Sequence, residues 1–231
     1  MAVWYVPSAL VLLLVGAGVF GANTGALQPE TGYQWFSWGI GIAGVSLLPL
    51  GAALLLEPLR GPATRAILIP LLVLFAGVVP SLSSLDAPAI HDITTDPEDS
   101  LLFAPDVAAG EREPGRALVL AEQRRAYSDI APLQVRASPV DAFQHAAEIA
   151  RSMSGWRVTS VDAVRGRIQA HDTSRVFRFR DDVIIRVQPA ADGQGARVDV
   201  RSRSRAGPSD LGVNAARIRA YLAAYRAGGL R

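Results

Sequence analysis

The sequence predicts an α+β protein in which three transmembrane helices precede a water-soluble domain of order β-α-β-β-β-β-α. The first observation behind this prediction is an abrupt change in charge. All but two of the 21 acidic and all but two of the 23 basic residues lie at or after Asp86; the exceptions are Glu30, Glu57, Arg60 and Arg65. The second observation is that helix and strand patterns return only after residue 126. The change in charge at Asp86 indicates a membrane part joined to an aqueous part.

Three apolar stretches, residues 4–20, 34–56 and 66–85, contain no charged side chain. About 20 residues are needed to span roughly 30 Å of hydrocarbon, so residues 1–85 are predicted to form a membrane anchor. A transport function is not indicated, because no ionisable group lies at membrane depth. Small residues at helix-packing spacing predict either packing among these helices or contact with a membrane protein partner: Ala17, Gly21, Gly25, Gly39 and Ala43.

The arginines predict the orientation of the anchor. Arg60 and Arg65 lie between the second and third stretches, whereas residues 21–33, between the first and second, include no basic residue. Basic loops stay in the cytoplasm, so the N-terminus is expected there too, with the C-terminal domain on the opposite side. We therefore expect a multi-pass protein of the inner (cytoplasmic) membrane of a Gram-negative cell, with a periplasmic domain.

Missing residue types exclude several activities. The chain has no lysine, which excludes Schiff-base chemistry and a P-loop, and no cysteine, which excludes thiol catalysis, disulfides and thiolate metal sites. A formal net charge of +2 gives no indication of nucleic-acid binding. The sequence also lacks the motifs of serine hydrolases, zinc proteases and dinucleotide-binding enzymes. No cofactor and no metal are predicted, and a non-catalytic role is favoured over an enzyme.

Residues 86–126 lack periodicity and predict an extended tether or a segment covering the domain, which is expected over residues 127–231. Ser138, Pro139 and Asp141 predict a helix start, followed by an apolar stripe of Val140, Phe143, Ala147, Ala150 and Met153. His145 lies off this stripe and is expected in solvent. The strands are expected over residues 133–135, 156–161, 167–171, 176–187 and 197–204, and a final helix over residues 210–225. This order favours one antiparallel sheet with both helices on one face.

Alternation along the last strand separates two kinds of side chain. Val198 and Val200 share one face, and Arg197, Asp199, Arg201, Arg203 and Arg205 share the other. The arginine face is interpreted in two ways. It is a solvated face whose arginines pair with Asp199 and neighbouring acids, or it is a surface for anionic lipid head groups or a phosphorylated envelope polymer.

Two segments carry candidate ligand-binding residues. The first follows the third apolar stretch and contains His91, Asp92, Thr94, Thr95 and Asp96. The second runs from the last strand into the last helix and contains Arg201, Arg203, Arg205, Asp210, Asn214 and Arg217. With Trp156 and Asp182, these segments resemble the domain-of-unknown-function 1499 family over residues 88–225. That resemblance implies no established reaction.

In the second segment, arginines lie beside a helix N-terminus, where free amides and the helix dipole favour an anion. Asp210 already occupies this field, so the alternative is that Asp210 caps the helix and pairs with an arginine. Asp92, Asp96, Glu98 and Asp99 do not match the spacing of an EF-hand calcium site. No catalytic residue is identified.

The function expected from these observations is non-catalytic: a membrane-anchored envelope protein that binds an anionic envelope component or a partner protein. Two alternatives remain open. One is a membrane-tethered hydrolase that uses His91 and neighbouring acids, and the other is an accessory subunit of a membrane complex. Membrane lipid is a partner in each case.

Overall fold

The computed structural model describes residues 5–82, 86–99, 101–103, 116–207 and 209–229. The chain forms two compact units. One contains the N-terminal helices up to Asp86 together with Arg175–Arg178, and the other contains Ala87–Ser174 and Phe179–Arg231. We describe each unit by itself.

The first unit confirms the three predicted apolar helices: α1 (Val6–Thr24), α2 (Pro29–Ala53) and α3 (Glu57–Leu82). Among the described residues, each of the three has a span long and apolar enough to cross a membrane. The third helix begins nine residues before the predicted stretch, because Glu57 and Pro58 favour a helix start. Arg65 therefore lies inside α3 rather than in a loop, within the span 61–79.

Small residues bring α1 and α2 together. A Cβ on Gly18 would lie 2.5 Å from the Gly32 carbonyl oxygen, and one on Gly39 would lie 2.6 Å from a Val15 methyl carbon. Larger residues at these positions would push the helices apart. Gly21 and Ala43, which the sequence pattern singled out, are buried as well. Packing within the chain therefore accounts for most of the small-residue pattern.

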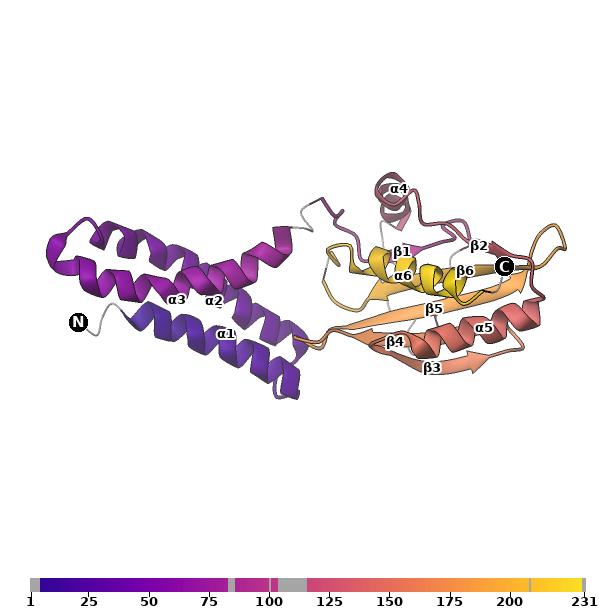
Figure 1. The fold of residues 1–231 in the computed structure, drawn as a ribbon, viewed down its shortest axis with the longest axis horizontal. Helices are drawn as coiled ribbons and strands as arrows, with labels where there is room; N and C mark the ends of the chain where they lie inside the picture. The colour runs from indigo at the N-terminus through magenta and orange to yellow at the C-terminus, as the bar shows by residue number, and fades with distance from the viewer. Residues whose placement is uncertain (1–4, 83–85, 100, 104–115, 208, 230–231) are drawn as a thin grey trace. The chain divides into compact units, whose positions relative to one another are not determined.

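The second unit is an antiparallel sheet with helices, as the sequence predicted, but its described residues form six strands where five were expected (Figure 1). The strand order is β1-β6-β5-β4-β3, and β2 pairs with the same edge of β6 as β1. Helices α5 and α6 lie on one face of the sheet (Figure 1). The strands are β1 (Asp92–Thr94), β2 (Leu133–Val135), β3 (Trp156–Asp162), β4 (Arg167–Thr173), β5 (Arg180–Pro189) and β6 (Ala196–Ser204). The helices are α4 (Arg116–Ala126), α5 (Pro139–Ser152) and α6 (Val213–Ala227).

The core lies between the sheet and the pair α5–α6. Two α6 tyrosines lie at its centre, and their hydroxyls donate to α5 carbonyls: Tyr221 to Ala146 at 3.0 Å and Tyr225 to Ala142 at 3.1 Å. The Trp156 ring stacks on Tyr221 with a centroid distance of 5.4 Å. Burying these rings removes large apolar areas from water, while the hydroxyls keep hydrogen-bond partners.

The apolar stripe of α5 differs from the predicted one. Val140 is 66 % exposed, whereas Ala142 and Ala146 are fully buried. At 3.6 residues per turn, a stripe centred on Ala146 leaves Val140 about 120° away. His145 was expected in solvent, but it is half-buried, and its Nε2 lies 3.0 Å from the Tyr225 carbonyl oxygen on α6.

Two element boundaries also differ, for a common reason. Arg178 has φ 63°, so the predicted strand 176–187 begins only at Arg180. Leu211 has φ 54° and Gly212 has φ 84°, so the last helix begins at Val213 rather than at residue 210. A positive φ is incompatible with both a regular strand and a right-handed helix. The sequence analysis did not predict β1 or α4.

Candidate functional site

Strand pairing brings the two candidate segments side by side. In β1 and β6, Asp92 lies opposite Arg203 and Thr94 lies opposite Arg201. Because side chains alternate along a strand, Arg201 and Arg203 point away from α5 and α6, while Ser202 points toward them. We call the side of the sheet opposite α5 and α6 the outer face. The candidate segments therefore contribute to two separate networks.

On the outer face, Arg201 is fully buried. Its Nε and Nη2 donate to the two carboxylate oxygens of Asp92 at 2.8 and 2.7 Å, and its Nη1 donates to the Leu101 carbonyl. The guanidinium carbons of Arg201 and Arg203 each lie 4.8 Å from the centroid of the Phe103 ring. Residues 101–103 therefore cover this part of the sheet.

Further along the same face, two arginines share three carboxylates. Arg186 Nη2 lies 3.0 Å from both Asp96 Oδ2 and Asp199 Oδ2, and its Nη1 lies 2.6 Å from Asp99 Oδ2. Arg197 Nε donates to Asp199 Oδ1 at 2.9 Å. Asp199 is fully buried, so these charges depend on one another for solvation. On β6, the arginines of the outer face are thus largely paired with carboxylates and covered by residues 101–103.

On the helix side, Asn214 is fully buried and makes four hydrogen bonds. Its Oδ1 accepts from Ser202 Oγ and Arg217 Nη1, both at 2.6 Å. Its Nδ2 donates to the His91 carbonyl and to Ser204 Oγ, both at 3.0 Å. One α6 side chain therefore joins the helix to β6 and to the residue before β1.

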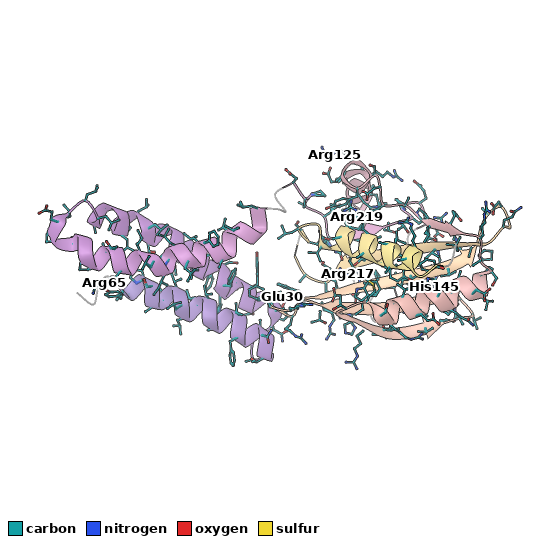
Figure 2. The ribbon with its side chains drawn as sticks, viewed as in Figure 1. Glu30, Arg65, Arg125, His145, Arg217 and Arg219 are labelled. Atoms are coloured by element: carbon teal, nitrogen blue, oxygen red, sulfur yellow. The ribbon has the colours of Figure 1, made fainter. Side chains whose placement is uncertain are left out.

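Arg217, labelled on α6 in Figure 2, lies one turn after Asn214 and continues this network. Its Nη2 donates to Asp172 Oδ2 on β4 at 2.9 Å and to Asp181 Oδ2 on β5 at 2.7 Å. The guanidinium is largely buried, and two carboxylates compensate its charge. The geometry fits a clamp between helix and sheet.

Asp210 caps α6. Its Oδ1 accepts from the Gly212 amide at 2.8 Å and its Oδ2 from the Asn214 amide at 2.9 Å. The anion at this helix terminus is thus the protein's own carboxylate. Ser209 Oγ, which lies nearby, donates to the Pro88 carbonyl and accepts from the Leu211 amide.

The threonine hydroxyls of the first segment accept hydrogen bonds from backbone amides. Thr95 Oγ1 accepts from the Val200 amide at 2.9 Å, and Thr94 Oγ1 accepts from the Asp96 amide at 3.2 Å. On the open edge of β1, the Gln123 side chain accepts from the Thr94 amide and donates to the Thr94 carbonyl. This α4 glutamine occupies the place of a neighbouring strand, a contact that the sequence analysis missed.

A different group of cations, which we call the basic patch, lies on the outer face of β3, β4 and β5 and just after the end of β6: Arg157, His171, Arg180 and Arg205. In register, His171 lies between Arg157 on β3 and Asp182 on β5. Arg205 makes a bidentate pair with Asp182, at 2.8 and 2.7 Å. Arg157 and Arg180 are exposed, and neither forms an ion pair within the part of the chain that the structure describes.

The imidazole of His171 reports the charge of this patch. Its pKa is lowered, first by partial burial and then by repulsion from Arg180 and Arg205, which the attraction of Asp182 does not offset. With three arginines and one carboxylate around His171, the patch has an excess of positive charge. Side-chain alternation in the sequence places His171, Arg180 and Arg205 on the side of the sheet away from the helices. Arg157 belongs to another strand, and only the register brings it next to His171. Across the described ranges, no group of three or more His, Asp and Glu side chains is placed to hold a metal ion.

A family model described as "Protein of unknown function (DUF1499)" matches residues 92–225, which is more than half of the chain. Comparison with curated proteins and with solved structures gave no match. The match includes all six strands, α4, α5 and nearly all of α6. The chain belongs to the DUF1499 family, with three apolar helices preceding the family domain.

Proposed function

We propose that this chain is a multi-pass inner-membrane protein whose periplasmic domain binds an anionic envelope component through the basic patch. The proposed orientation follows from Arg60 and Arg65, which lie in the first three turns of α3, near the α2–α3 turn, and favour a cytoplasmic position for that turn. The domain follows α3 and would then lie on the other side of the membrane. The binding role is non-catalytic.

The observation that carries the proposal is the imbalance of charge at His171. Three arginines surround the imidazole, and Asp182 already pairs with Arg205. Guanidinium groups match the geometry of phosphate oxygens, and Arg157 and Arg180 have no carboxylate partner among the described residues. A phosphate-bearing ligand would supply the missing negative charge.

The candidate residues from the sequence support the domain rather than this ligand. Arg201, Asn214 and Arg217 are buried and satisfied by protein groups. An external anion could reach them only by displacing these partners, which would leave buried charges uncompensated. Binding therefore belongs to the exposed arginines of the basic patch, above all Arg157 and Arg180, which those two segments do not include.

Exposure also restricts the kind of anion. A solvent-exposed ion pair contributes only about 0–1 kcal/mol, so one phosphate on this patch would bind weakly. A polymer with repeated phosphates gains from binding several at once. The proposed ligand is therefore a polyanion of the envelope.

The test uses the full chain in neutral detergent, with a polyphosphate of defined length as the probe. We expect Arg157→Gln with Arg180→Gln to weaken binding about tenfold, from two contacts of roughly 0.7 kcal/mol each. The control is Arg136→Gln with Arg226→Gln, which removes two exposed arginines from another part of the domain. Equal losses in both double variants, or no loss in the first, would refute the proposal.

A further inference from the structure

The connection between β4 and β5 contains residues that do not group with the sheet. Arg175–Arg178 belong to the compact unit formed by the apolar helices. Within that unit, the side-chain amide of Asn23, at the end of α1, donates to the Arg175 carbonyl at 2.7 Å. Because Asn23 lies next to the α1–α2 connection, residues 175–178 contact this end of α1.

Aromatic rings strengthen the same contact. The Phe177 ring lies 5.4 Å from the ring of Tyr33 at 90° and 5.2 Å from that of Phe36 at 65°. Tyr33 and Phe36 form part of the aromatic group at the start of α2. Aromatic side chains gather at the level of lipid head groups, so this ring cluster marks a membrane–water interface.

Two arginines lie within two residues of Phe177 in the sequence. Arg175 and Arg178 are exposed, and neither forms an ion pair within the described ranges. Glu30, in the first turn of α2, is the one charged residue of α1, α2 and the connection between them, so Arg175 and Arg178 outnumber the acids of these two helices. Arg178 also has φ 63°, an unfavourable conformation for a residue with a side chain.

We propose that this cluster binds the head-group phosphate of an anionic phospholipid. Arg175 and Arg178 supply the positive charge, and Phe177, Tyr33 and Phe36 hold them at the depth of the head groups. Long arginine side chains next to an apolar residue such as Val176, which is 48 % exposed, can keep their stems in the interface and their charge at the phosphate. The site shares no residue with the basic patch and depends only on the helices crossing the membrane.

The test measures lipid preference in the intact chain. The full protein is reconstituted into vesicles, and tryptophan fluorescence is quenched with brominated phosphatidylglycerol or brominated phosphatidylcholine at equal mole fractions. Trp35 and Trp38 lie on α2 beside Phe36 and report the lipid at this site. We expect phosphatidylglycerol to be preferred about thirtyfold, from two arginines near an anionic surface.

Three double variants separate this site from other cations. Arg175→Gln with Arg178→Gln should abolish the preference, whereas Arg175→Lys with Arg178→Lys should retain most of it. Arg157→Gln with Arg180→Gln should leave it unchanged, because those residues belong to the basic patch. Equal quenching by the two lipids in the unaltered chain, or a preference that survives the first variant, would overturn the inference. The inference would also be overturned if only Arg157→Gln with Arg180→Gln abolished the preference.

Discussion

Replacing Asn214 by alanine removes four hydrogen bonds from the interior of the domain. Three of them join neutral groups and are each worth about 1 kcal/mol, and the bond from the Arg217 guanidinium is worth about 2 kcal/mol. Ser204 is only half-buried and can bond to water instead. We therefore expect Asn214→Ala to lower the free energy of unfolding by about 4 kcal/mol, a large part of a typical domain's stability.

The measurement is urea unfolding of the full chain in neutral detergent, followed by the fluorescence of Trp156. That ring stacks on Tyr221 in the core and reports unfolding of the domain. The other three tryptophans precede residue 39, so they should change little while the helices stay in the micelle. Gln144→Ala, at an exposed position of α5, is the control and should change stability by less than about 0.5 kcal/mol. A loss below about 1 kcal/mol for Asn214→Ala would refute the view that this side chain joins α6 to β6.

Other predictions concern the hairpin turn, pH dependence and topology. Gly195→Ala should cost more than about 2 kcal/mol, because φ is 90° and the new Cβ would lie 2.0 Å from a β2 carbonyl oxygen. Gly193→Ala, at φ 71° in open space, should cost only about 1 kcal/mol; similar urea midpoints for the two variants would contradict this. Burial raises the pKa of Tyr225 to about 12, from an ordinary value of 10.0. The contribution of Tyr225 to stability is complete below pH 10 and is lost as the pH rises toward 12. Between these pH values, the melting temperature of the unaltered chain should therefore fall more steeply than that of Tyr225→Phe. Because the chain has no cysteine, Val164→Cys, at a side chain 96 % exposed, should react with a membrane-impermeant maleimide in cells with a permeabilised outer membrane. Leu55→Cys should react only after the inner membrane is opened, and the opposite pattern would reverse the proposed topology.

Features that depend on neighbours in the sequence were predicted well. The start of α5 is an example: Ser138 Oγ accepts from the Asp141 amide at 3.1 Å, as the Ser-Pro-x-Asp pattern indicates. The three apolar helices and the antiparallel sheet follow from composition and from period-2 alternation in the same way. These signals survive folding because the residues that produce them stay adjacent.

Features that depend on conformation at single residues or on very short elements were missed. Strand β1 has only three residues, too few for alternation to be recognised. The late starts of β5 and α6 result from positive φ angles at Arg178, Leu211 and Gly212. A positive φ at arginine or leucine is rare, so no sequence rule would have placed it there.

The sequence by itself determined that arginines and valines of β6 occupy opposite faces, because side-chain direction alternates with the backbone. Only the tertiary structure decided what each side chain meets. Arg201 pairs with Asp92, 109 residues away in sequence, and Arg186 pairs with Asp96, 90 residues away. These partners depend on strand register and on the path of the segment after β1. Strand register also placed Arg157 beside His171, so the complete basic patch became visible only in the folded domain.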